Sequence, residues 1–178
     1  MSDPLHRSFE DLETAIRGLD AGPRDNGSVD TIVFRLPDEG RATPGRALVS
    51  PEGGLHGDRW VLNPERNPGA QMTLMNAGVA LAVAGSRDRI PMAGDNLIVR
   101  FDLSEENLPA GTRLRIGEAI VEVSDVPHTG CQKFNRRFGE GALRLVSLKE
   151  YRLQNFRGIN VRVLEGGQIA VGDAIRKV

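Results

Sequence analysis

The sequence has few of the residues from which cross-links and metal sites are usually built. Its 178 residues include one cysteine, Cys131, and three histidines, His6, His56 and His128. A single cysteine excludes an intramolecular disulfide, a CxxC redox pair and any zinc site that needs two thiolates. Three scattered histidines also argue against a metal site made of histidine alone.

Aromatic residues, charge excess and long apolar runs are scarce as well. Aromatics make up 4% of the chain, which argues against a stacking platform for bases. Lys and Arg total 23 against 24 Asp and Glu, so no basic field predicts nucleic acid or an anionic membrane as a partner. The longest apolar stretch, 78–85, is too short to span a bilayer, and the N-terminus lacks a secretory signal. We therefore expect a cytoplasmic protein.

Glycine and proline, in contrast, are plentiful, with 21 and 10 residues. Many turn formers favour short strands over a helical bundle. The first segment differs, because apolar residues at steps of three and four predict a helix over 8–19 with Ser8 as its N-cap. The polar run 21–28 then ends it. We interpret 1–28 as a helical extension with a linker and 29–178 as the main domain.

Three further helices are predicted within that domain. Asn76 is placed to cap a helix over 76–84, which Gly85 ends. Two short helices are expected over 131–138 and 142–151, divided by glycines.

The rest of the domain has the pattern of strands. Gly117-Glu118 between two apolar segments predicts a hairpin with a type II′ turn. The whole pattern predicts a mainly β fold, a closed or partly open β-barrel with a few short helices. The expected strands are 29–36, 46–50, 71–75, 96–101, 112–116, 119–123, 159–164 and 169–178.

Cys131 lies in the segment with the most chemical promise. It stands at the predicted start of a helix, where unpaired N–H groups and the helix dipole favour negative charge. Lys133, Arg136 and Arg137 follow within six residues. Nearby cations also favour the thiolate, which is the reactive form of cysteine. Gly130 permits close approach of the backbone to a ligand. These features predict a reactive thiol.

Other interpretations of this segment stay open. A lone cysteine is often a small buried hydrophobe, and a run of cations is often a solvated helix face. The cations near a helix N-terminus are also typical of a phosphate site. His128 begins the segment and is counted among the residues expected to contact a ligand.

Two loops supply the remaining candidates. His56, Asp58 and Arg59 lie between glycines and the only tryptophan, Trp60. His56 and Asp58 could act as metal ligands or as a proton-transfer pair, or the loop could be a structured turn with Trp60 in the core. Asn96 precedes a predicted strand and either donates to a ligand or closes a turn. No spacing selects a metal site from these residues.

Eight short segments occur in an order and spacing that together are specific. They are Leu55-His-Gly-Asp-Arg59, Gln71-Met-Thr-Leu-Met75, Gly94-Asp-Asn-Leu97, Leu108–Gly117, Cys131-Gln-Lys-Phe134, Arg136-Arg-Phe-Gly139, Arg157–Leu164 and Gly172-Asp173. Over residues 29–178 the chain resembles the MOSC domain, named after the C-terminal domain of molybdenum cofactor sulfurases. Asp95 stands where that family often has Glu, and Gly130 stands where it often has Pro.

The resemblance implies a barrel like that of the pyruvate kinase barrel domain, with one functional cysteine. MOSC domains are thought to transfer sulfur or to bind the molybdenum cofactor (molybdopterin). In cofactor sulfurases a pyridoxal-phosphate cysteine desulfurase is the partner domain. This chain has no room for one, so we expect no pyridoxal phosphate in it and a desulfurase acting in trans. Relatives that reduce N-hydroxylated substrates carry the cysteine on molybdenum and have an N-terminal barrel region that residues 1–28 are too short to replace.

Three hypotheses follow for the function. In the first, Cys131 is the catalytic residue and carries a persulfide sulfur to a metal–sulfur centre, such as the molybdenum cofactor or a molybdoenzyme acceptor. In the second, the chain is a cofactor-bound oxidoreductase with Cys131 as the molybdenum ligand. In the third, it is a binding module with an inert cysteine. The residues expected to contact the cofactor are His56, Asp58, Arg59, Asn96, His128, Lys133, Arg136 and Arg137.

Overall fold

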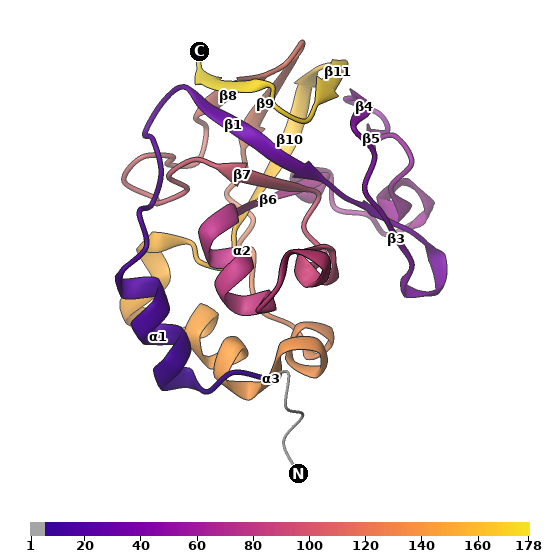
Figure 1. The fold of residues 1–178 in the computed structure, drawn as a ribbon. Helices are drawn as coiled ribbons and strands as arrows, with labels where there is room; N and C mark the ends of the chain where they lie inside the picture. Colours follow the sequence, from indigo (N-terminus) through magenta and orange to yellow (C-terminus); the bar gives the residue numbers. More distant parts are fainter. Residues whose placement is uncertain (1–5) are drawn as a thin grey trace.

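A closed barrel of seven strands is the centre of the computed structural model, which describes residues 6–178 (Figure 1). Around the barrel the strands run in the order β1, β12, β8, β9, β10, β6, β7. All neighbours are antiparallel except β6 and β7, which are parallel. Their bounds are β1 (Gly27–Ile32), β6 (Met72–Asn76), β7 (Leu97–Arg100), β8 (Arg113–Ile116), β9 (Ala119–Val123), β10 (Ile159–Glu165) and β12 (Ala174–Lys177). The prediction of a mainly β barrel is therefore confirmed.

Two small sheets flank the barrel. One is the hairpin β2 (Phe34–Arg35) and β3 (Arg41–Ala42), with the turn Pro37–Glu39 at its tip. The other has the order β11 (Gly167–Ala170), β4 (Arg46–Ser50), β5 (Gly54–Leu55).

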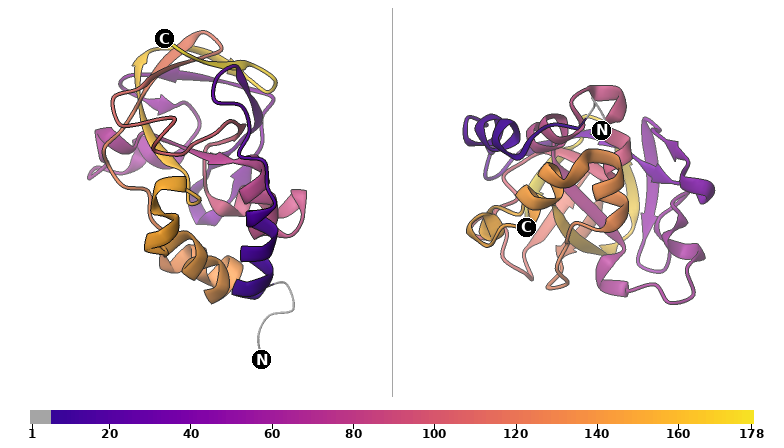
Figure 2. Two further views of the ribbon diagram at one scale, coloured as in Figure 1. Left: turned by 90° about the vertical axis from the view of Figure 1, so that its left-hand side faces the viewer. Right: turned by 90° about the horizontal axis from the view of Figure 1, so that it is seen from below.

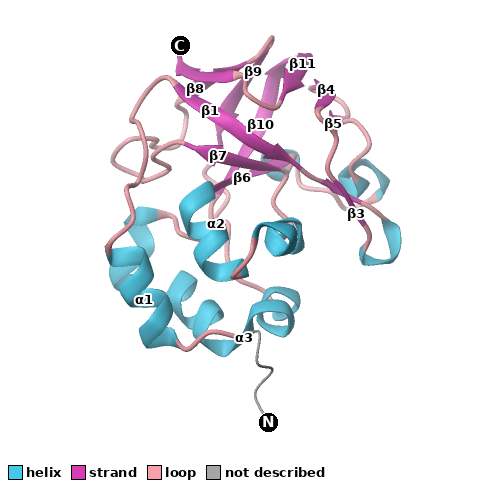
Figure 3. Cartoon of the chain, viewed as in Figure 1, coloured by secondary structure: helices cyan, strands magenta, loops and turns pink. Residues whose placement is uncertain are grey.

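Helices cover one end of the barrel, as Figures 2 and 3 show from different sides. They are α1 (Phe9–Arg17), α2 (Ala77–Ala84) and α3 (Gln132–Ser147). No helix of residues 6–178 is long and apolar enough to cross a membrane. Single-turn to two-turn 3₁₀ segments complete the chain, at Pro37–Glu39, Arg59–Leu62, Pro68–Ala70, Arg87–Ala93 and Lys149–Gln154.

The apolar residues form two clusters that follow this division. One fills the barrel and includes Leu74, Val99 and Leu114. The other lies between the barrel end and the helices and includes Leu12 and Phe134. The N-terminal helix α1 thus packs on the rest of the chain, because its buried residues belong to this second cluster. The first five residues, on which the expectation of no secretory signal partly rests, lie outside the described part.

Several local signals in the sequence are confirmed. The Ser8 hydroxyl accepts from Asp11 N at 3.1 Å and caps α1, and Gly85 ends α2 at a φ of 78°. The two predicted short helices form one element, α3, that kinks at Gly139 with a φ of 85°. Gly117 begins the β8–β9 turn at a φ of 56°.

Two strand predictions are wrong in detail. The stretch 169–178 is broken into β11 and β12 around Gly172, whose φ is 91°. The stretch 29–36 is likewise divided into β1 and β2. In both places the chain passes between the barrel and a small sheet, which alternation of apolar residues cannot reveal.

Asn76 gives a test of how the barrel and the helical layer are joined. Its Oδ1 accepts from Gly78 N and Val79 N, and its Nδ2 donates to Ala21 O and Phe101 O. We expect Asn76→Ala to lower the free energy of unfolding by about 2 kcal/mol, the upper end for an N-cap. Urea denaturation measures this loss. Ser8→Ala removes one cap bond at an exposed helix end and should cost less. Equal losses would contradict the linking role of Asn76.

Candidate functional site

Cys131 is the N-cap residue of α3, and its side chain is exposed. Its backbone is extended, with φ −126° and ψ 171°, and its carbonyl accepts the first helical bond from Asn135 N at 3.0 Å. The side chain makes no capping hydrogen bond. The thiol is therefore exposed at the N-terminus of α3 and does not satisfy the N–H groups of the first turn, which have no intrahelical partner.

Gly130 brings the loop before the cysteine onto the second half of its own helix. A Cβ at Gly130 would lie 2.5 Å from Leu143 Cδ1 and 3.2 Å from Val146 Cγ2. The sequence suggested close approach to a ligand, whereas the neighbour here is α3 itself. This contact fixes the segment 128–131 against the helix.

The three cations that follow Cys131 share one carboxylate, Glu39. The distances from Glu39 oxygens are 3.4 Å to Lys133 Nζ, 3.0 Å to Arg136 Nη2 and 2.9 Å to Arg137 Nη2. The hydrogen bond from Arg137 is the main cause that lowers the pKa of Glu39 to about 2. The cations expected to stabilise the thiolate are thus engaged by a residue of the β2–β3 hairpin tip, to which no sequence pattern pointed.

Replacing Glu39 tests how strongly this carboxylate governs the charge near the thiol. With Glu39→Gln, three cations lose their counter-charge. We expect Cys131 alkylation by anionic iodoacetate, relative to neutral iodoacetamide, to rise roughly two- to five-fold at low salt. Glu140→Gln is the matched control, because it removes an exposed carboxylate from α3, the helix that Cys131 caps. An unchanged rate ratio in Glu39→Gln at low ionic strength would contradict the prediction.

Four arginines come together next to this ion cluster. A Cβ at Gly94, whose φ is 84°, would lie 3.6 Å from Arg41 Nη2 and 3.9 Å from Arg137 Nη1. Burial lowers the pKa of Arg41, and the charges of Arg137, Arg59 and Arg35 lower it further. Carbonyl oxygens hold the two central guanidiniums in place, through Arg41 Nε to Pro91 O at 2.9 Å and Arg137 Nη1 to Met92 O at 3.0 Å. We call Arg35, Arg41, Arg59 and Arg137 the arginine cluster. Such a convergence of fixed guanidiniums favours an anionic ligand.

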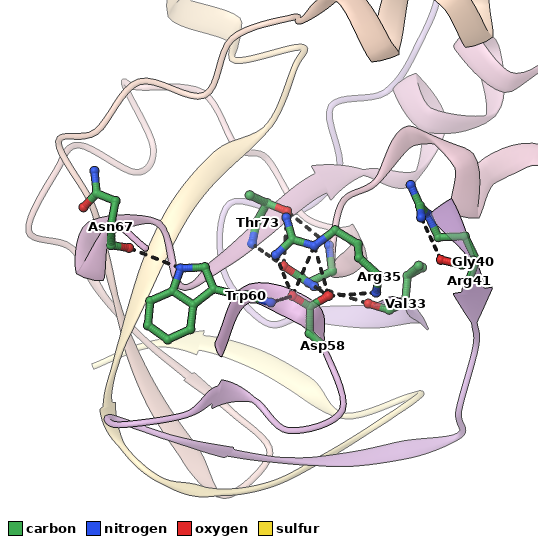
Figure 4. A network of polar contacts seen from close by, with 9 residues as sticks. Val33, Arg35, Gly40, Arg41, Asp58, Trp60, Asn67 and Thr73 are labelled. Carbon is green, nitrogen blue, oxygen red and sulfur yellow. Dashed lines mark hydrogen bonds and ion pairs between the residues drawn. The ribbon is translucent and has the colours of Figure 1, made fainter. Parts of the chain in front are cut away.

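The Asp58 carboxylate points into the protein, where both of its oxygens accept hydrogen bonds (Figure 4). It accepts from the Arg35 guanidinium at 2.7 Å, from Arg35 N at 2.7 Å and from Trp60 N at 2.9 Å. Asn96 Nδ2 donates to the same carboxylate at 3.0 Å. Burial opposes ionisation, but the Arg35 bonds outweigh it and hold the pKa of Asp58 below its usual value.

Asn96 and His56 are occupied in different ways. Asn96 is buried, and its Oδ1 accepts from Thr73 N at 3.1 Å. His56 is exposed, with Nε2 3.0 Å from Ser50 Oγ. The structure thus directs His56 and Asp58 to different partners. Within residues 6–178, no group of three or more His, Cys, Asp or Glu side chains is placed to hold a metal ion.

A buried ionic network is centred on Asp95, the residue after Gly94. Asp95 is fully buried, and its Oδ2 lies 2.6 Å from Arg157 Nη1. The Arg157 guanidinium also lies 4.8 Å from the ring centroid of Phe134, the third residue of α3. His128 Nδ1 is 3.5 Å from Asp95 Oδ1, too long for a hydrogen bond, and both atoms are buried without another partner.

His128 is uncharged at neutral pH in this position. Burial lowers its pKa to about 4, although the charge of Asp95 acts in the opposite direction. Gly158 lies beside the imidazole, since a Cβ there would be 3.4 Å from His128 Nδ1. Its φ of 96° also brings the backbone close to Leu74 O, where a Cβ would collide. The imidazole is therefore a neutral hydrogen-bonding group three residues from the thiol.

The sequence pattern of the MOSC domain matches residues 68–176. The chain belongs to the MOSC domain family. This match includes Cys131, the Gly94-Asp-Asn segment and Arg157, so the resemblance that the sequence suggested is confirmed. No curated protein matches the chain.

Solved structures show the same fold. YuaD from Bacillus subtilis has a TM-score of 0.63 at 16% identity, with 84% of this chain and 94% of that chain covered. YiiM from Escherichia coli has a TM-score of 0.56 at 20% identity, with 85% and 69% covered. YiiM from Geobacillus stearothermophilus has a TM-score of 0.55 at 18% identity, with 85% and 75% covered.

Sequence reasoning missed two parts of this MOSC site. Arg35, Glu39 and Arg41 precede the matched residues 68–176 and carry no motif. Asp95 and Arg157 lie within segments on which the family resemblance rests, but nothing in the sequence indicates that these two residues, 62 positions apart, form a pair. A signal did exist for Arg157, because it begins the segment Arg157–Leu164 on which the family resemblance rests.

Proposed function

We propose that this MOSC protein is a sulfur carrier, in which Cys131 takes up sulfur as a persulfide and delivers it to a metal–sulfur centre such as the molybdenum cofactor. The observation that carries the proposal is the position of the thiol. Cys131 is exposed at the N-terminus of α3 and makes no capping bond. A thiol with a structural role would be buried in one of the two clusters.

The loading step is an exchange between sulfur atoms. The Cys131 thiolate attacks the outer sulfur of a donor persulfide, and a new S–S bond forms on Cys131. The S–S bond of the donor breaks at the same time, and the donor leaves as a thiolate. The donor is a cysteine desulfurase acting in trans. The persulfide formed on Cys131 is an anion at the N-terminus of α3, where the helix dipole favours negative charge.

The arginine cluster suits the acceptor side of the transfer. Arg137 follows Cys131 by six residues, about 9 Å along a helix. Gly94 leaves the space in front of Arg41 and Arg137 free of a side chain. Guanidiniums held by carbonyl oxygens fit the phosphate of a pterin cofactor. Arg41, Arg59 and Arg137 would hold such a phosphate. Asp58 and Asn96 would hold the surrounding loops in place rather than contact the phosphate, since their polar atoms are hydrogen-bonded within the protein.

Mass spectrometry of the intact chain tests the carrier role. After incubation with a cysteine desulfurase and cysteine, we expect a gain of one sulfur atom on Cys131, reversed by dithiothreitol. Cys131→Ser is the matched control and should gain none. Loading that persists in Cys131→Ser, or failure of the wild-type chain to load from several desulfurases, would overturn the proposal.

The arginine cluster also supports a second candidate, a molybdenum-cofactor oxidoreductase in which Cys131 is a ligand. Its thiolate is a soft donor of the kind that molybdenum–sulfur chemistry uses, and the bound cofactor would supply oxygen-atom and electron transfer. The positive charge of the arginine cluster complements the negative charge of the cofactor phosphate. Elemental analysis of protein from a molybdenum-replete host should then show molybdenum, which Cys131→Ser and Arg137→Gln would reduce. Metal-free protein that also fails reconstitution would remove this candidate.

A further inference from the structure

A cavity lies beside the cysteine loop, and the proposed sulfur chemistry does not use it. Its volume is about 460 Å³, within the range of small-molecule sites. The walls are the loop 127–129, the end of α3, the 3₁₀ segment Lys149–Gln154 and residues 155–157. It shares no lining residue with the arginine cluster.

The charged side chains that line this cavity are all cations. They are Lys149, Arg152 and Arg157, and no Asp or Glu is among the lining residues. Lys149 and Arg152 form no ion pair with any other residue of 6–178. Arg157 is 6% exposed, pairs with Asp95 through Nη1, and has a buried Nε without a hydrogen-bond partner. The cavity therefore has unbalanced positive charge.

The remaining walls combine apolar surface with neutral polar groups. Val146, Leu148 and Phe156 give the apolar part. Asn155 donates its Nδ2 to Leu103 O, which leaves its Oδ1 as an acceptor. The His128 imidazole is neutral at pH 7, so the positive charge comes from Lys and Arg alone. A ligand that suits these walls has one anionic group on a compact non-polar body.

We propose that this cavity binds a small organic acid, a carboxylate carried on a non-polar body. Lys149 and Arg152 meet the carboxylate, and the apolar residues cover the body. The occupant also contacts His128 and Thr129, which precede Cys131 by three and two residues in the chain. Because none of these contacts involves sulfur transfer, the inference stands independently of the proposed function.

NMR titration of the ¹⁵N-labelled full chain tests the site with three probes. Benzoate has both charge and body, benzamide has the body without charge, and inorganic phosphate has charge without the body. We expect saturable shifts from benzoate at amides of 127–129 and 146–157, and affinities for benzamide and phosphate at least about ten-fold lower. Arg152→Gln and Lys149→Gln, both at exposed positions, should each weaken benzoate about five-fold.

Arg46→Gln is the matched control, since Arg46 is exposed on β4 and does not line the cavity. It should leave benzoate binding unchanged. Several results would overturn the proposal: no saturable shift, shifts confined to the arginine cluster, equal binding of benzamide or phosphate, or equal weakening by Arg46→Gln.

Discussion

Arg157→Met should lower the free energy of unfolding by about 3–5 kcal/mol, because it leaves the buried carboxylate of Asp95 without a counter-charge. Asp95 is fully buried and Arg157 is 6% exposed, with 2.6 Å between Oδ2 and Nη1. The melting temperature should fall by roughly 6–20 °C for a chain of this size. Urea denaturation measures the free energy directly.

The chain contains a matched control for this prediction. Arg162 and Glu122 form an ion pair with the same 2.6 Å separation, but the Arg162 side chain is 54% exposed. Arg162→Met should therefore cost no more than about 1 kcal/mol. The double variant Asp95→Asn with Arg157→Met removes both charges and should recover much of the loss. Equal effects of Arg157→Met and Arg162→Met would show that burial does not determine the strength of this pair.

The sequence predicted the elements whose signals are local. Ser8 and Asn76 cap their helices as expected, because an N-cap is recognised by residues within three positions. The hairpin at Gly117 and the helix end at Gly85 follow from the backbone freedom of glycine. The start of a helix at Cys131 was also predictable, because its signal is local: Gly130 is followed directly by helix-forming residues.

The environment of Cys131 could not be predicted in the same way. Lys133, Arg136 and Arg137 were assigned to the thiol because they are near it in sequence. In the fold they meet Glu39, 97 and 98 residues before Arg136 and Arg137. Charge partners that distant depend on how the β2–β3 hairpin folds over the barrel end. Neither amphipathic pattern nor charge pattern contains that information.

The partners of Asp58 and Asn96, the candidates on the two loops, could not be predicted from the sequence either. Asp58 and Asn96 look like ligand contacts because they are polar residues on glycine-rich loops. A buried polar group must find partners, and these two find them in Arg35, Thr73 and each other. Their bonds hold the backbone that carries Gly94 and, with it, the open space before Arg41 and Arg137. We therefore propose that they shape the site rather than contact a ligand.

His128 should make this protein lose stability as the pH falls from about 6.5 to 4. The folded-state pKa is about 4 and the unfolded value is about 6.5. Between these values the unfolded chain binds a proton that the folded chain does not, so the free energy of unfolding rises with pH. The whole change is about 3 kcal/mol, complete once the pH exceeds the unfolded value.

His128→Gln isolates this contribution, because glutamine fills a similar space and does not titrate. The difference in free energy of unfolding between wild type and His128→Gln, measured in urea at pH 4 to 7.5, should therefore change by about 3 kcal/mol in favour of wild type as the pH rises. Titrations common to both chains cancel in this difference. His56→Gln, at an exposed histidine bonded to Ser50, should show no such trend. A flat difference for His128→Gln would mean that the imidazole is solvated in the folded chain. In that case burial of the imidazole would not contribute to fixing the segment from His128 to Cys131 at the start of α3.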